Sequence, residues 1–190
     1  IDLVDLVIGA EGLFGLVTGC ELVLAPRPEG YMDLFFSLPA EADALKILEH
    51  VSAHYDGDLS GLSAFEYFGV NCRKTMDHEN QFFHGDDTVA MYIQQPLHGQ
   101  EPEDAAMEWL ERLMESGCDL DEDAILLLDS DKLRSLFLEA RHSLPANALE
   151  VVQKRGTYTI MTDTVVPPDR FAEFLDFTHG LLKEQGLDYV

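Results

Sequence analysis

The sequence has few basic residues and lacks long apolar stretches. Lysine and arginine together number 12, against 36 aspartate and glutamate residues, which gives a formal net charge of −24. A surface with this charge repels nucleic acids and anionic membranes, so neither is expected as a partner. No apolar run is long enough to cross a bilayer, so we expect no transmembrane segment.

Cysteine is also scarce. Cys20, Cys72 and Cys118 form an odd set without a C-x-x-C spacing. This argues against a disulfide framework and against a structural zinc site. We therefore expect a reducing compartment and predict a cytoplasmic location.

The apolar content is that of a globular protein. Hydrophobic residues make up 46% of the 190 positions, enough for one well-buried domain, or for one domain and a remnant of another. The chain begins at Ile1, inside an apolar segment and without a methionine. We expect it to be a piece of a longer protein.

Hydrophobic periodicity and turn residues divide the chain into alternating strands and helices. Strands are predicted at residues 16–25, 31–38, 88–94, 124–128 and 156–166, and another is predicted to begin at residue 188. Helices are predicted at residues 41–54, from residue 102 to Gly117, at 131–144, and from Pro167 to Gly186. Pro145 is predicted to bend or interrupt the third of these, and its continuation over residues 147–154 is left open. A short helix or turn is predicted at residues 1–8. Residues 62–68 fit either a strand or a helix start, and residues 71–85 have no regular pattern.

This order of elements allows two fold classes. Strands that alternate with helices occur in doubly wound parallel sheets. The strands here are only half apolar, however, whereas parallel strands covered on both faces are near-continuous apolar runs. We therefore predict an α+β fold, in which an antiparallel sheet of the ferredoxin-like type has its helices packed on one face.

A glycine-rich stretch near the start carries the first specific signal. Gly9, Gly12 and Gly15 are spaced by three and precede a β-branched run. The stretch is neither a Walker phosphate loop, because the lysine is missing, nor a dinucleotide-binding motif, because the pattern is not G-x-G-x-x-G. Residues 8–18 resemble the I-G-S-E-G-T-L-G-I-I-T segment of FAD-linked oxidases of the glycolate oxidase, D-lactate dehydrogenase and D-2-hydroxyglutarate dehydrogenase type. Residues 10, 13 and 14 depart from that pattern. Without this resemblance, the glycines would indicate an ordinary turn.

The resemblance implies a cofactor and a domain division. In that family this segment lies along the flavin and is followed by a cap domain that covers the substrate. It implies that residues 1–27 are the C-terminal remnant of an FAD-binding domain and that residues 28–190 are the cap. The residues that it implies as flavin contacts are Gly9, Glu11, Gly12, Gly15 and Val17.

The last third of the chain carries a second resemblance. An R-x-x-x-P element at Arg141 and a D-x-x-V-P element at Asp163 are similar to the same oxidases, in which the matching arginine binds the substrate carboxylate. A guanidinium offers paired donors that match the two oxygens of a carboxylate. A surface arginine paired with a neighbour such as Glu139 is the alternative. Asp163 is interpreted as structural, and Met161 stands where some members have a lysine that assists with dicarboxylic substrates.

The resemblance implies an FAD-dependent enzyme that oxidises a D-2-hydroxy acid, such as D-lactate or glycolate, by hydride transfer to the flavin. The electron acceptor is not specified. The family's H-x-G-D/N-x-x-H motif, which binds a divalent metal and serves catalysis, would follow Val190. We therefore expect no catalytic or metal-binding residue within the 190 residues. We also expect the chain on its own to be inactive and not to retain FAD.

Two histidine pairs offer metal-ligand residue types. His78 and His84 lie in an acidic stretch that matches no known site geometry, and His50 and His54 lack a third ligand. We interpret them as parts of a polar loop and a polar helix edge. The alternative to the oxidase hypothesis is a stand-alone acidic α+β module that binds a small ligand or a protein.

Overall fold

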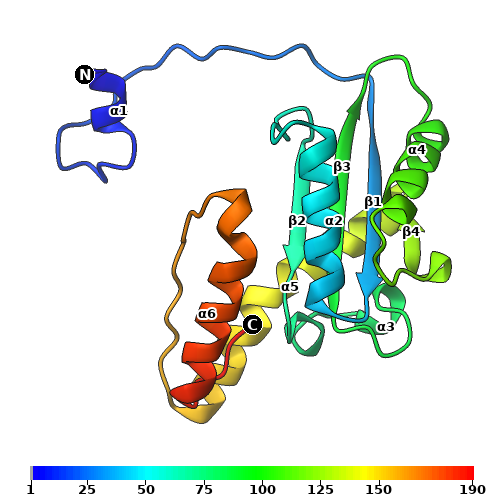
Figure 1. Ribbon diagram of the computed structural model, residues 1–190. Helices are drawn as coiled ribbons and strands as arrows, with labels where there is room; N and C mark the ends of the chain where they lie inside the picture. Colours follow the sequence, from blue (N-terminus) through cyan, green and yellow to red (C-terminus); the bar gives the residue numbers. More distant parts are fainter. Residues whose placement is uncertain (1) are drawn as a thin grey trace.

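The computed structural model describes residues 2–190, which form a four-stranded sheet flanked by helices (Figure 1). The sheet is antiparallel throughout, with the strand order β2-β3-β1-β4. Its strands are β1 (Gly30–Leu38), β2 (Ala64–Phe68), β3 (Val89–Leu97) and β4 (Ile125–Leu127). The helices are α1 (Leu3–Val7), α2 (Glu41–His54), α3 (Glu79–Phe82), α4 (Pro102–Glu115), α5 (Asp131–Arg155) and α6 (Phe171–Glu184). Short 3₁₀ turns occur at η1 (Cys72–Lys74), η2 (Glu122–Ala124) and η3 (Pro168–Arg170).

The topology is that of a split βαβ fold. Helix α2 connects β1 to β2, α4 connects β3 to β4, and β1 and β3 occupy the centre of the sheet. This arrangement confirms the predicted α+β class with a ferredoxin-like sheet.

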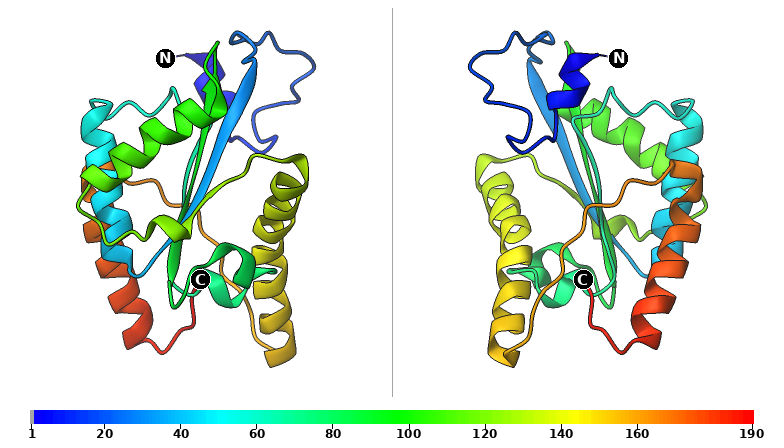
Figure 2. Two further views of the ribbon diagram at one scale, coloured as in Figure 1. Left: turned by 90° about the vertical axis from the view of Figure 1, so that its right-hand side faces the viewer. Right: turned by 90° about the vertical axis from the view of Figure 1, so that its left-hand side faces the viewer.

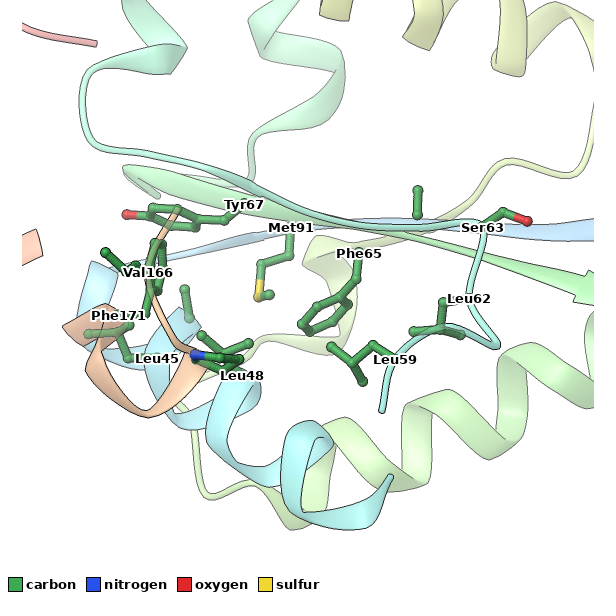
Figure 3. A pocket seen from close by; sticks show the side chains of 13 residues that line it. Leu45, Leu48, Leu59, Leu62, Ser63, Phe65, Tyr67, Met91, Val166 and Phe171 are labelled. Carbon is green, nitrogen blue, oxygen red and sulfur yellow. The ribbon is translucent and has the colours of Figure 1, made fainter. Parts of the chain in front are cut away.

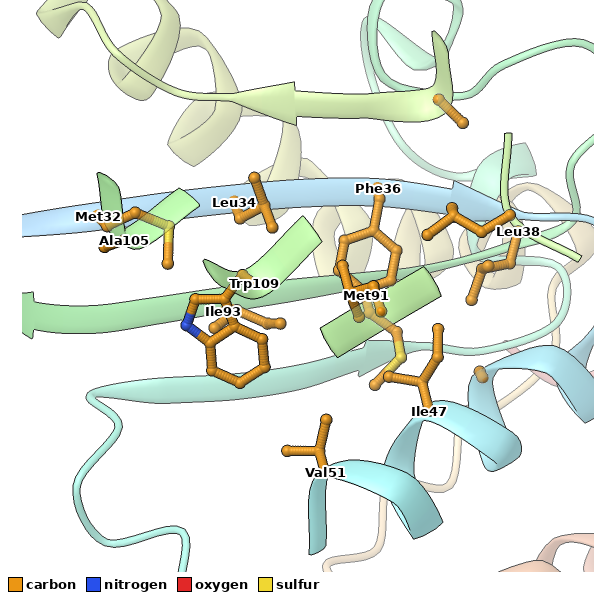
Figure 4. Packing of buried hydrophobic residues seen from close by; sticks show 14 of the residues in the cluster. Met32, Leu34, Phe36, Leu38, Ile47, Val51, Met91, Ile93, Ala105 and Trp109 are labelled. Carbon is orange, nitrogen blue, oxygen red and sulfur yellow. The ribbon is translucent and has the colours of Figure 1, made fainter. Parts of the chain in front are cut away.

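The first core lies between the sheet and helices α2 and α4 (Figure 4). From α4, Trp109 is fully buried and its indole N–H donates to Gln95 Oε1 at 2.7 Å, so that the ring fills the layer without an unpaired donor. From α2, Ile47 and Val51 contribute buried side chains to the same cluster. Alternate residues of β1 point toward these helices, and the buried side chains of Met32, Leu34, Phe36 and Leu38 form the opposite wall of this core.

A second core lies on the opposite face of the sheet. The prediction that helices pack on one face only therefore differs from the structure. Helix α5 covers this face, as the edge-on views show (Figure 2). Phe35 points away from α2. The centroid of its ring lies 5.3–6.1 Å from the ring centroids of Phe68, Phe82, Phe83 and Phe137. Since β1 carries large apolar side chains on both faces, both faces must be covered.

Two predicted strands do not form. Residues 16–25 and 156–166 contain no strand, and apolar side chains in both segments are largely exposed. A strand is stable only when its backbone groups pair with a neighbour, and within residues 2–190 neither segment has one. The strand predicted to begin at residue 188 is also not formed among the described residues.

Helix α5 covers both the predicted segment 131–144 and the continuation over residues 147–154 that the sequence left open. It begins at the cap Ser130, whose side chain accepts from the Leu133 amide, and ends at Gly156 in the left-handed conformation. Pro145 lies inside it without ending it. No helix of residues 2–190, α5 included, combines the length and the apolar character that a membrane span requires.

Asp43 connects α2 to the loop after α4, and this contact gives a prediction about pH. Its carboxylate accepts from Lys46 Nζ at 2.8 Å and from the Asp119 amide at 3.1 Å. Burial acts to raise the pKa of Asp43, but the hydrogen bonds from Lys46 and Asp119 outweigh it and hold the pKa below its ordinary value of 3.8. The carboxylate therefore contributes stability above pH 3.8, and this contribution is lost as the pH falls through the lower pKa of the folded state.

Asp43→Asn is accordingly expected to lower the free energy of unfolding at pH 7 by about 1.5 kcal/mol, as for a hydrogen bond to a charged group. It should also flatten the loss of stability below pH 4. Urea titrations from pH 7 to pH 3 measure both effects, with the exposed Asp104→Asn as the matched control. If Asp43→Asn lost stability below pH 4 as steeply as the wild-type protein, the role given to the Asp43 carboxylate would be contradicted.

Candidate functional site

A cluster of polar side chains lies on the face of the sheet that α5 covers. We call it the Arg141 cluster, and its members are Asp33, Glu66, Tyr92, Gln94 and Arg141. In the sheet register Asp33 is opposite Gln94, and Glu66 is opposite Tyr92. Cross-strand partners point to the same face, so three strands aim four polar side chains toward α5.

Asp33 is the buried carboxylate of this cluster. It is 4% exposed, and its Oδ1 accepts from the Tyr92 hydroxyl at 2.5 Å and from Gln94 Nε2 at 2.7 Å. Burial, followed by the hydrogen bond to Asp33, raises the pKa of Tyr92 well above its ordinary value. Tyr92 is therefore a neutral phenol at physiological pH, and it can donate a hydrogen bond but not act as a base.

Arg141 reaches the cluster from α5. Its Nε donates to Glu66 Oε2 at 2.8 Å and its Nη2 donates to Glu66 Oε1 at 2.7 Å, a two-point carboxylate contact. The hydrogen bond to Glu66 raises the pKa of Arg141 further, so the guanidinium remains charged. Among the described residues, its Nη1 has no hydrogen-bond partner, and the side chain is 37% exposed. The predicted alternative partner, Glu139, lies instead 3.9 Å from His78.

The irregular segment after β2 fixes the position of Arg141 along the sheet. The Asp77 amide donates to Ser143 Oγ at 2.8 Å, and Asn147 Nδ2 donates to the Thr75 carbonyl at 2.8 Å. Both contacts attach this segment to α5 at positions close to Arg141. Pro145 follows Arg141 by four residues and has no amide hydrogen, so it cannot donate to the Arg141 carbonyl.

The residues predicted to contact flavin lie apart from this cluster. Gly9, Glu11, Gly12, Gly15 and Val17 are all exposed, in an N-terminal segment that stands away from the sheet (Figure 1). The structure therefore does not bring them together with Arg141. Whether they contact FAD stays a prediction.

The glycine segment can be tested for its fit to FAD. Gly9, Gly12 and Gly15 have positive φ values of 74°, 83° and 145°, and a Cβ added to any of them would meet no atom within 4 Å. Backbone this open allows a flat ring system to approach closely. Within residues 2–190, nothing packs against these three glycines. The segment therefore does not enclose a flavin by itself, and the other contacts would come from other residues.

An apolar cavity of about 590 Å³ lies on the other face of the sheet, between β2, α2 and the start of α6 (Figure 3). Leu45 and Leu48 line it from α2, Phe65 and Tyr67 from β2, and Phe171 from α6. No charged side chain lines it. A carboxylate substrate or the FAD pyrophosphate needs cationic or amide donors, so the cavity fits neither.

The histidines do not form a metal site in the part of the chain that the structure describes. No group of three His, Cys, Asp or Glu side chains gathers there with metal-binding geometry. His84 lies 3.5 Å from Asp121, His78 lies near Glu139, and His50 lies 4.0 Å from Glu115. These are separate surface contacts.

Comparison with known protein families decides the assignment. Residues 34–190 match the family described as FAD linked oxidases, C-terminal domain. The chain belongs to this family. It contains the C-terminal domain of an FAD-dependent oxidoreductase, and the match spans the whole Arg141 cluster except Asp33. A search of curated proteins found no match to the chain.

Sequence reasoning found Arg141 but missed its partners in this FAD-linked oxidase domain. Asp33, Glu66, Tyr92 and Gln94 are single polar residues within apolar strands. A buried charge inside a central strand was the available signal, because such residues are rare unless paired. Their convergence, however, depends on the strand order, which the sequence pattern alone does not provide.

Proposed function

We propose that the FAD-linked oxidase containing this domain oxidises a D-2-hydroxy acid, such as D-lactate, or the related glycolate. The observation that supports this most strongly is Arg141, a permanently charged and partly exposed guanidinium on the sheet face, within a domain of the FAD-linked oxidase family. It is also the arginine of the R-x-x-x-P element.

In this proposal the chain's own residues position the substrate. The Arg141 guanidinium anchors the carboxylate through paired donors, and Tyr92, kept neutral by its environment, lies opposite Glu66 in the sheet register. Gly9, Gly12 and Gly15 would contact bound FAD, which would supply the acceptor for a hydride from the substrate Cα.

The charge of the cluster supports a monocarboxylic substrate. Asp33 and Glu66 contribute two negative charges against the one positive charge of Arg141. A second substrate carboxylate would meet no additional cation in this cluster, and Met161 offers none in place of the lysine found in some relatives. We further propose that a divalent metal is held by residues beyond those described here.

The test of the proposal is a comparison of electron donors. The full-length oxidase that contains this domain, called the FAD-loaded protein from here on, should be assayed with an artificial electron acceptor and a panel of D-lactate, L-lactate, glycolate and D-2-hydroxyglutarate. We expect the highest kcat/KM for a monocarboxylic donor, with D-lactate favoured over L-lactate. Turnover of none of these acids, or equal turnover of both lactate enantiomers, would contradict the proposal.

A further inference from the structure

Glu66 occupies Arg141 in the same way that a substrate carboxylate would. Both of its oxygens accept from the guanidinium, at 2.8 Å from Nε and 2.7 Å from Nη2. We propose that Glu66 is the resting ligand of Arg141, and that a substrate carboxylate binds by displacing it. This inference rests on the proposed function, because it takes Arg141 as the substrate anchor.

The charges around Arg141 favour exchange over simultaneous binding. Asp33 from β1 and Glu66 from β2 are the carboxylates of the cluster, Tyr92 from β3 is neutral, and Arg141 from α5 is the one cation among them. A substrate that bound with Glu66 in place would bring a second carboxylate to one guanidinium, in a cluster that also holds the buried Asp33. Repulsion between anions is strong at a partly buried site, because water screens it less there than in bulk solvent. Departure of Glu66 removes this repulsion.

Glu66 is the carboxylate that is able to leave. Asp33 is held by two donors and is 4% exposed, so it is fixed. The Glu66 side chain is 32% exposed on β2, which is an edge strand of the described sheet. Within residues 2–190, its side-chain hydrogen bonds are those to Arg141. Rotation toward solvent therefore breaks one partly exposed ion pair and leaves no buried group unpaired.

This exchange makes Glu66 a competitor of every carboxylate that binds Arg141. A simple carboxylate such as acetate replaces the Glu66 contact with an equivalent one and gains no further hydrogen bond. Glu66 also competes as a group already in place, at an effective concentration that a small free anion does not match. A 2-hydroxy acid adds contacts through its hydroxyl group. Glu66 therefore weakens the binding of simple carboxylates and of the hydroxy acid by the same factor, and the contacts of the hydroxyl group leave the hydroxy acid the tighter ligand.

The experiment is a substitution that removes the charge of Glu66 and keeps its shape. In the FAD-loaded protein, Glu66→Gln is expected to lower the KM for D-lactate and the inhibition constant for acetate by about fivefold each, the factor that corresponds to loss of a partly exposed ion pair. The kcat should stay within about twofold, since the substitution acts on binding. The matched control is Glu139→Gln, which lies two residues before Arg141 on α5, is exposed and should change neither constant.

Three results would overturn the inference. A higher KM with a lower kcat in Glu66→Gln would show that Glu66 positions Arg141 instead of competing for it. Unchanged constants in Glu66→Gln would show that Glu66 has no role in binding. Should Glu66→Gln not fold, ¹³C NMR of the Glu66 carboxylate in the wild-type protein replaces it. D-lactate should move this signal toward that of a free glutamate, and an unmoved signal at saturation would likewise overturn the inference.

Arg141→Gln separates this inference from the proposed function. Loss of D-lactate binding in Arg141→Gln, together with unchanged constants in Glu66→Gln, would reject the role of Glu66 and keep the anchor. Unchanged binding in Arg141→Gln would reject the anchor itself, and the inference with it.

Discussion

Replacement of Arg141 by glutamine is expected to lower kcat/KM for D-lactate by about 10²–10³-fold. Two charge-assisted hydrogen bonds to a carboxylate contribute about 3–4 kcal/mol together, and each 1.4 kcal/mol corresponds to a factor of ten. Glutamine retains a donor but neither the charge nor the paired geometry. Steady-state kinetics of the FAD-loaded protein with D-lactate measure the effect.

The chain offers a closely matched control for this substitution. Arg134 lies on the same helix, its side chain is 36% exposed, and it contacts Asp131 and the Leu128 carbonyl rather than the cluster. Arg134→Gln should leave kcat/KM within about twofold, as for a surface ion pair of small energetic effect. Equal losses in the two variants would indicate a general effect on α5 and would remove the evidence for an anchor.

Replacement of Phe35 by alanine is expected to give the largest loss of stability, about 3–5 kcal/mol, as for buried phenylalanines elsewhere. Phe35 is fully buried on the central strand β1 and contacts aromatic residues from β2, α3 and α5. Its removal leaves a cavity that strands on both sides prevent from collapsing. Urea unfolding followed by circular dichroism measures the change.

Phe177→Ala serves as the control for Phe35→Ala. Phe177 lies on α6 and is 70% exposed, so its truncation should change the free energy of unfolding by less than about 0.5 kcal/mol. A loss below about 1 kcal/mol in Phe35→Ala would contradict a packed second core, because such a small value is typical of an exposed site.

The central part of the fold was predictable because its elements are locally encoded. Helix α2 has the predicted bounds, and Pro102 and Gly117 bracket α4 as their conformational preferences require. Strand β1 was found from its aromatic and aliphatic run. The cover on its second face was missed, because the sequence does not reveal that Phe35 has partners about 30 to 100 residues away in the chain.

The errors have a common physical cause. Residues 16–25 and 156–166 have the composition of strands, but strand formation depends on a partner that local sequence does not specify. Pro145 was expected to bend or interrupt α5, with a continuation over residues 147–154 left open, and the structure shows the continuation. Ser143, which accepts from the Asp77 amide, and Asn147, which donates to the Thr75 carbonyl, hold the helix in place on either side of the missing donor.

The candidate site was predictable only in part for the same reason. Arg141 was identified from a motif, which is local in sequence. Glu66 lies 75 residues away and became its partner through the pairing of β2 with β3 and the packing of α5 on the sheet. The glycine segment was also selected by its motif, and its contact with flavin stays a prediction, because that role requires contacts that residues 2–190 do not provide.

The most direct measurement of the central claim is anaerobic reduction of the protein-bound flavin by D-lactate, followed by loss of the visible flavin absorption. For the wild-type protein we expect a reduction rate that saturates with D-lactate concentration, and for Arg141→Gln a half-saturating concentration that is far higher. A flavin that no 2-hydroxy acid reduces, or one that D-lactate reduces identically in both proteins, would contradict the proposal that this cap domain anchors a hydroxy acid.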